Sequence, residues 1–200
     1  MVFQVVVFHT RTPPLFIAYQ LARIPGSTSF CGDSTMAGGG HWRAPGIDGP
    51  AGFLTRNLAG NGYLTYQVKA QVTRGVSDYH PKKIYIACGV NDAFAVIAGR
   101  TTVQQSALDL RELIQNTDGI LILTLPTPTR SLEVNSILKK LKTAYTEQAS
   151  GKAIVVDLWP QLCDHEGMLG RDFTVDGVHL SPKGYALWRT DLKKNAVKNQ

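Results

Sequence analysis

The chain reads KKIYIACGVND over residues 82–92, where a short apolar run ends at a glycine and is followed by polar side chains. The run from Lys82 to Cys88 shows no polar alternation, which is typical of a strand buried on both faces. Residues 119–125 and 153–158 repeat the pattern, and each run ends at polar or turn residues. Strands buried on both faces belong to parallel sheets covered by helices, so this stretch indicates an α/β fold.

Amphipathic segments fill the intervals between these runs. Residues 102–116 and 132–148 carry apolar side chains at helical spacing, and Thr101 or Thr102 is a candidate N-cap of the first segment. A last helix is expected from about Pro182 to Lys194, because proline is tolerated in a first turn. Upstream, the candidate strands are residues 2–8 and 28–31, and a candidate helix spans residues 13–23. This alternation predicts parallel strands joined by helical crossovers.

The length and composition limit the class of protein. The chain has 200 residues, 44% of them hydrophobic and 18% charged, which suits one globular domain. No segment approaches the roughly 18 consecutive apolar residues of a transmembrane helix, so no membrane span is expected. The apolar N-terminus lacks a basic region and a small-residue cleavage site, which favours a cytoplasmic location over secretion. Nothing in the sequence indicates the oligomeric state.

The charge and the scattered cysteines and histidines argue against several kinds of partner. The net charge is +6, and much of the excess lies in the C-terminal helix and tail. No nucleic-acid-binding signature accompanies it, so we expect no nucleic-acid partner and interpret the basic end as a solvated face, with binding to acidic polysaccharide as the alternative. Three single cysteines indicate free thiols, and no two histidines stand at metal-ligand spacing. We therefore predict no metal and no cofactor.

Four polar segments follow the predicted strands or lie between them. They are Gly32-Asp33-Ser34-Thr35-Met36-Ala37, Asn57-Leu58-Ala59-Gly60-Asn61-Gly62, Gly89-Val90-Asn91-Asp92 and Asp176-Gly177-Val178-His179. In parallel α/β sheets ligands bind beyond the carboxyl ends of the strands, which makes these segments the candidates for a functional site.

Together, in this order and at these spacings, the four segments resemble the SGNH hydrolase family, also called GDSL esterases and lipases. The resemblance extends from about Phe30 to Leu187. It implies a three-layer α/β/α sandwich with a flavodoxin-like, mainly parallel five-stranded sheet. It also implies a single domain over residues 26–200, with residues 1–25 as an N-terminal extension of uncertain structure.

The resemblance assigns a catalytic triad to three of these residues. A serine hydroxyl is a poor nucleophile at neutral pH, so acyl transfer needs an imidazole that takes its proton and later delivers it to the leaving alcohol. Ser34 is the expected nucleophile and His179 the expected base. Asp176 is expected to hold the imidazole of His179 in one tautomer. The alternative for Asp176 is a purely structural aspartate that caps a turn or a helix.

The same resemblance predicts the groups that stabilise the negative oxygen of the tetrahedral intermediate. They are the backbone N–H of Ser34, the backbone N–H of Gly62 and the side-chain amide of Asn91. Each such donor is worth about 10²- to 10³-fold in rate. Gly62 has no side chain to block the acyl oxygen. Gly60 is the alternative, because the segment contains two glycines.

The opening block, Gly32 to Ala37 followed by glycines, resembles that of rhamnogalacturonan acetylesterases, and the block around His179 resembles carbohydrate and small-acyl esterases. Both favour hydrolysis of a short acyl group, acetyl above all, on a small-molecule or carbohydrate ester through an acyl-enzyme. The alternatives are a lipase, thioesterase or acyltransferase of the same fold, or a non-catalytic binding module.

Gly38–Gly40 is interpreted as a flexible lip of the pocket, and Trp42 as either a sugar-stacking or a core-covering side chain. The resemblance also makes the strands ending at Cys31 and Cys88 neighbours. These cysteines are then either a redox-sensitive pair or two small apolar core residues.

Overall fold

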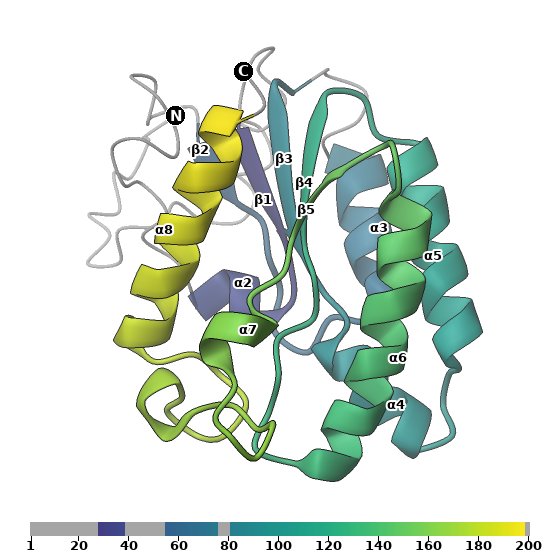
Figure 1. Ribbon diagram of the computed structural model, residues 1–200. Helices are drawn as coiled ribbons and strands as arrows, with labels where there is room; N and C mark the ends of the chain where they lie inside the picture. The colour runs from purple at the N-terminus through teal and green to yellow at the C-terminus, as the bar shows by residue number, and fades with distance from the viewer. Residues whose placement is uncertain (1–27, 39–54, 76–80, 199–200) are drawn as a thin grey trace, which may run out of the picture.

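One parallel sheet of five strands forms the centre of the protein. The computed structural model describes residues 28–38, 55–75 and 81–198 (Figure 1). Every neighbouring pair of strands is parallel, and the strand order is β2-β1-β3-β4-β5. The bounds are β1 Thr28–Gly32, β2 Thr55–Asn57, β3 Lys83–Ala87, β4 Ile120–Thr124 and β5 Ile154–Val156.

Helices cover both faces of this sheet. One face carries α3, α5 and α6, with α4 near the carboxyl ends of the strands, and the other carries α2, α7 and α8 (Figure 1). The bounds are α2 Ser34–Gly38, α3 Thr65–Gly75, α4 Val90–Ile97, α5 Val103–Gln115, α6 Leu132–Ala149, α7 Trp159–Leu162 and α8 Pro182–Lys198, with a short 3₁₀ turn at Arg171–Phe173. Among the described helices, none has both the length and the apolar character needed to cross a membrane.

The alternation of side chains along the strands divides the core into two clusters. Ile84 and Ile86 of β3 point to the α3/α5/α6 side, whereas Tyr85 and Ala87 point to the α8 side. On the α8 side the rings of Phe30 and Tyr85 stack with their centroids 4.6 Å apart. Because the central strands β3 and β4 carry apolar side chains on both faces, both faces of the sheet need a covering layer of helices, and three layers are the physical consequence.

The predicted fold class is confirmed: the protein is an α/β sandwich with a parallel, flavodoxin-like sheet. The capping prediction for α5 is also confirmed, because the Thr102 hydroxyl accepts a hydrogen bond from the Gln105 N–H at 3.0 Å. The prediction that the last helix ends near Lys194 was wrong, since α8 continues to Lys198. The candidate strand at residues 2–8, the candidate helix at 13–23, Trp42 and the extension over residues 1–25 lie outside the described residues.

The sheet order determines where a site can form. From β1 the chain moves outward to β2 at one edge, and β3, β4 and β5 then follow on the other side of β1. The order therefore reverses between β1 and β3, and the crevice beyond their carboxyl ends is the place where ligands bind in folds of this kind. The segments that follow these two strands carry Ser34 and Asn91.

Candidate active site

Ser34 stands at the point where β1 turns directly into α2. All five residues of β1 are buried, and the strand pairs with β3 along its whole length. A side chain at Gly32 would collide with the backbone carbonyl of Ala87 on β3, so glycine is required by close approach of the two strands. The Asp33 N–H then donates to that Ala87 carbonyl at 3.1 Å, which places Ser34 just beyond the edge of the sheet.

His179 and Asp176 come from a tight loop between the 3₁₀ turn and α8. The Thr174 hydroxyl accepts from the Gly177 N–H at 2.7 Å and donates to the His179 carbonyl at 2.8 Å, so one side chain closes the loop. Gly177 has φ +92°, a backbone conformation that residues with a Cβ rarely adopt. The Arg130 N–H donates to the Gly177 carbonyl at 2.8 Å and ties the loop to the segment after β4.

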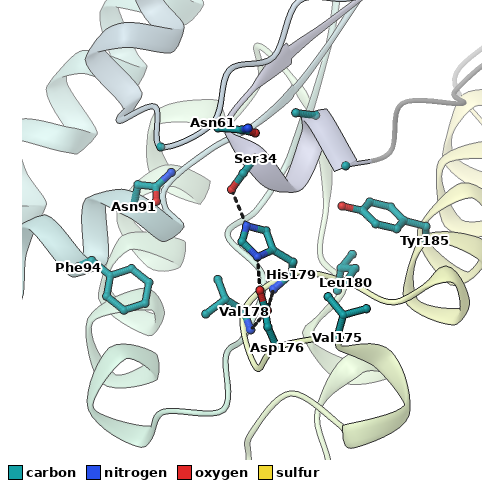
Figure 2. Close-up of a pocket in the computed structure, with 13 residues that line it drawn as sticks. Ser34, Asn61, Asn91, Phe94, Val175, Asp176, Val178, His179, Leu180 and Tyr185 are labelled. Atoms are coloured by element: carbon teal, nitrogen blue, oxygen red, sulfur yellow. Dashed lines mark hydrogen bonds and ion pairs between the residues drawn. The ribbon is translucent and has the colours of Figure 1, made fainter. Parts of the chain in front are cut away.

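Ser34, His179 and Asp176 form one chain of hydrogen bonds (Figure 2). His179 Nε2 lies 2.9 Å from Ser34 Oγ, and His179 Nδ1 lies 2.6 Å from Asp176 Oδ2. An ionised carboxylate can only accept, so Nδ1 carries the hydrogen of the neutral imidazole and Nε2 is left with its lone pair toward the Ser34 hydroxyl. This is the tautomer that can take a proton from serine.

Asp176 has two tasks, one for each carboxylate oxygen. Oδ1 accepts from the Val178 N–H at 2.9 Å and the His179 N–H at 2.7 Å, while Oδ2 binds the imidazole. The hydrogen bond with the His179 side chain, aided by these backbone donors, lowers the pKa of Asp176 to about 2. The turn-capping alternative from the sequence and the imidazole-orienting role are therefore both compatible with the geometry, because they use different oxygens.

The three residues predicted to donate to an oxyanion lie around the same pocket. Asn91 lies in the first turn of α4, and its side-chain amide donates to the Tyr63 carbonyl at 3.1 Å, which orients the NH₂ group toward the loop after β2. That loop is anchored beside Ser34, since Asn57 Nδ2 donates to the Met36 carbonyl at 3.1 Å. Gly62, Asn91 and Ser34 line one pocket.

The geometry separates the two glycines of this loop. The Gly60 N–H donates to the Gly32 carbonyl at 3.0 Å and continues the pairing of β2 with β1. Gly62 lines the pocket with φ +75°. A Cβ at Gly62 would meet no atom within 4 Å among the described residues, so this φ rather than crowding is what favours glycine there. The structure thus favours Gly62 as the predicted backbone donor.

A pocket of about 950 Å³ opens over these groups. Its lining includes the polar side chains of Ser34, Asp176, His179, Asn61 and Asn91, and the apolar side chains Phe94, Val175, Val178 and Leu180, which lie on both sides of His179 (Figure 2). Phe94 and Val175 are 38% and 66% exposed, so the mouth of the pocket presents apolar surface to solvent. Among the described residues, no cluster of three His, Cys, Asp or Glu side chains could hold a metal ion.

Sequence reasoning missed several residues around the pocket. Phe94 follows Asn91 by three positions on α4, a helical spacing that brings both side chains to one face. Tyr185 on α8 lines the pocket, and its hydroxyl donates to the Thr35 carbonyl of α2 at 2.8 Å. The helical spacing from a motif residue could have identified Phe94. No local signal could have identified Tyr185, because 150 residues separate it from Thr35.

Two motif aspartates that received no predicted role are buried behind the site. Asp33 is 1% exposed, and one carboxylate oxygen accepts from the Thr35 N–H at 2.9 Å. Burial raises the pKa of Asp33 to about 6. Asp92 is also buried, and burial raises its pKa as well.

Cys31 of β1 and Cys88, which directly follows β3, are free thiols. Cys31 and Cys88 are both buried in the core cluster on the α3/α5/α6 side, and burial raises the pKa of Cys31 to about 12. A thiol with a raised pKa has little thiolate and reacts slowly. The geometry therefore favours two small apolar residues in a crowded sheet.

The comparisons with known proteins agree with this architecture. The model of the GDSL-like lipase/acylhydrolase family matches residues 30–187. No curated protein shows significant sequence similarity to the chain. Similar solved structures include a GDSL-like lipase from Bacteroides thetaiotaomicron, at 18% identity over 88% of this chain and 89% of that one, with a TM-score of 0.74. A lipase/acylhydrolase from Enterococcus faecalis shares 21% identity over 84% and 93%, with a TM-score of 0.65. A variant of an acetyl xylan esterase from Geobacillus stearothermophilus shares 17% over 86% and 96%, with a TM-score of 0.65. Likenesses at these identities establish the fold.

Proposed function

Because the chain belongs to the GDSL-like lipase/acylhydrolase family, we propose that it is a serine esterase that hydrolyses short-chain acyl esters, acetyl esters above all, with Ser34 as nucleophile. One observation carries the proposal. Ser34 Oγ, His179 and Asp176 form a continuous hydrogen-bonded chain at the floor of an open pocket. This arrangement supplies both the base for attack and the acid for departure of the alcohol.

The proposed reaction has two steps, acylation of the Ser34 hydroxyl by the ester and hydrolysis of the resulting acyl-enzyme. The Ser34 oxygen attacks the ester carbonyl carbon as its proton passes to His179 Nε2, and the carbonyl oxygen becomes an oxyanion. The N–H groups of Ser34 and Gly62 and the Asn91 amide donate to that oxyanion. As the C–O bond breaks, the imidazolium returns the proton to the leaving alcohol. Water then gives a proton to the same nitrogen and attacks the acyl carbon. As the bond between the acyl carbon and the Ser34 oxygen breaks, the imidazolium returns the proton to that oxygen, which releases the acid and restores the hydroxyl.

The preference for a short acyl group rests on the opening block. Gly32 to Ala37 resembles the block of acetylesterases, and the polar side chain of Asn61 lines the pocket beside the triad. Polar groups of this kind suit an alcohol that carries hydroxyls, so an acetylated carbohydrate is the proposed substrate class.

A specific observation favours a second candidate, a lipase that takes longer acyl chains. Phe94 and Val175 line the pocket with exposed apolar surface, and Val178 and Leu180 add apolar side chains to the lining. Apolar area of this kind stabilises a bound acyl chain by about 0.8 kcal/mol for each methylene removed from water.

A series of p-nitrophenyl esters from acetate to palmitate distinguishes the two candidates. The proposal predicts that kcat/KM is highest for acetate or butyrate and that Ser34→Ala lowers turnover by about 10⁴-fold or more. A maximum at octanoate or beyond would favour the lipase. Equal turnover by wild type and Ser34→Ala would refute a serine mechanism at this site. Release of acetate from acetylated xylan and pectin then tests whether the alcohol part of the substrate is a carbohydrate.

A further inference from the structure

A buried carboxylate beside Asn91 is not used by the proposed reaction. Asp92 is 2% exposed and stands next to Asn91 on α4. Its Oδ2 accepts from both the N–H and the hydroxyl of Thr65, each at 3.0 Å, and its Oδ1 accepts from the Ser106 hydroxyl at 2.8 Å. Since the Thr65 hydroxyl has a single hydrogen, the Tyr145 hydroxyl donates to it, at 2.6 Å. A buried carboxylate with this many donors fixes whatever it binds.

Thr65 is the first residue of α3, so Asp92 caps that helix from another part of the chain. The first N–H groups of a helix have no partner within it, and a negative charge there is favourable because of the helix dipole. Thr65 and Ser106 are themselves buried, so no water replaces these bonds. The contact joins the start of α3 to the first turn of α4.

Consecutive residues of α4 thus bind the same short segment of chain at two points. The Asn91 amide donates to the Tyr63 carbonyl, and Asp92 accepts from Thr65 two residues later. Gly62 directly precedes Tyr63. Gly62 and Asn91 are the two proposed oxyanion donors other than Ser34. The distance between the Gly62 N–H and the Asn91 amide is therefore set by these two hydrogen-bonded contacts.

From this geometry, and resting on the proposed function for its kinetic consequence, we propose that Asp92 is a positioning residue that holds Gly62 and Asn91 in the arrangement required to stabilise the oxyanion. It acts through Thr65 and touches no substrate. Donors that must be preorganised lose their effect when displaced, and a misplacement of about 1 Å costs up to about 10²-fold in rate.

The chain offers matched variants to test this role. Thr65→Val removes one hydroxyl from Asp92 on the side of Gly62, whereas Ser106→Ala removes one hydroxyl from the same carboxylate on the side of α5. Both changes leave the buried carboxylate with one bond fewer, and because Thr65→Val also removes the acceptor of the Tyr145 hydroxyl, Tyr145→Phe is the control for that second loss. Asp92→Ala removes all the bonds, and Thr65→Ser restores the lost hydroxyl. A purely structural Asp92 would make Thr65→Val and Ser106→Ala alike.

The kinetic test uses p-nitrophenyl acetate. Thr65→Val is expected to lower kcat about tenfold and Asp92→Ala about 10²-fold, with KM nearly constant, because only transition-state stabilisation is lost. Ser106→Ala stays close to wild type, and Thr65→Ser recovers most of the loss. In an Asn91→Ala background Thr65→Val adds little, since the two changes remove the same stabilisation. Equal kcat for Thr65→Val and Ser106→Ala, or full additivity with Asn91→Ala, would overturn the proposal.

A second readout does not need turnover. Heteronuclear relaxation of the backbone amides of Gly62 and Tyr63 and of the Asn91 side-chain amide is expected to show greater motion in Thr65→Val and Asp92→Ala, but not in Ser106→Ala. If wild type cleaves no ester, the proposed function fails while relaxation still decides whether Asp92 holds this segment. Unchanged relaxation in Asp92→Ala refutes the positioning role, whatever the turnover.

Discussion

At the scale of single residues, the orientation of one imidazole determines whether Ser34 can lose its proton. Asp176 binds Nδ1 at 2.6 Å, and its pKa of about 2 keeps it an acceptor at all ordinary pH values. The His179 side chain is 41% exposed and that of Asp176 50%, so the loop, rather than burial, supplies the orientation. Asp176 Oδ1 holds that loop through two backbone N–H groups.

Asp176→Asn tests this orientation without removing the loop contacts. The amide oxygen can keep both backbone bonds, but the NH₂ group then faces His179 Nδ1 and donates to it. The imidazole hydrogen is forced onto Nε2, and this nitrogen can then no longer accept the Ser34 proton. We expect kcat to fall by about 10⁴-fold. Steady-state kinetics near neutral pH measure the effect, and a loss smaller than about tenfold would contradict the tautomer argument.

The three residues of the hydrogen-bonded chain, Ser34, His179 and Asp176, could be singled out from the sequence, whereas the residues around them could not. Ser34 and His179 stand in motifs whose residue types are required by acyl transfer. The structure brings both into hydrogen-bonding distance, which is the spatial condition that the motifs imply. Tyr185 and Phe94 carry no such chemical requirement, so only folding shows that they line the pocket.

At the scale of elements, helix α2 depends on a buried acid at its start. Asp33 Oδ1 accepts from the Thr35 N–H, and Oδ2 is buried with no partner among the described residues. Tyr185 of α8 binds the Thr35 carbonyl of the same short helix. Burial raises the pKa of Asp33 to about 6, so a charged Asp33 is unfavourable in the folded protein.

Asp33→Asn is predicted to change how stability depends on pH. Between about pH 4 and pH 6 the folded wild type holds a proton on Asp33 that the unfolded chain has released, so its free energy of unfolding falls as pH rises through this window. The Asn variant has no such proton. Its free energy of unfolding relative to that of wild type therefore rises by up to about 3 kcal/mol by pH 7. Urea unfolding of both proteins at several pH values measures the difference, and parallel stability curves would rule the explanation out.

The helices and strands that could not be predicted from the sequence are those whose apolar residues do not recur at a regular spacing. Helix α4 has eight residues that are mostly apolar, so it shows no polar face. Helix α3 is polar apart from a few positions such as Val68 and Val72. Strand β2 has only three residues. Long runs with a strict pattern, such as β3 and α6, were predicted within one or two residues because burial on one or both faces dictates their residue types.

At the scale of the whole molecule, the order of the strands brings distant segments together. Parallel strands place their carboxyl ends at one edge, and the reversal between β1 and β3 leaves an open crevice there. Ser34 enters it from β1, Asn91 from β3 and Gly62 from the loop after β2, while His179 arrives 145 positions after Ser34. The order of motifs in the sequence could predict this convergence, but not the apolar mouth at Phe94 and Val175.

Activation of the Ser34 hydroxyl by His179 is measured by covalent labelling with diethyl p-nitrophenyl phosphate, followed by intact-protein mass and peptide mapping. We expect wild type to gain a single diethylphosphoryl group on the peptide that contains Ser34, Ser34→Ala to gain none, and His179→Ala to be labelled more slowly by orders of magnitude. A label on another residue, or equal labelling rates in wild type and His179→Ala, would contradict this activation.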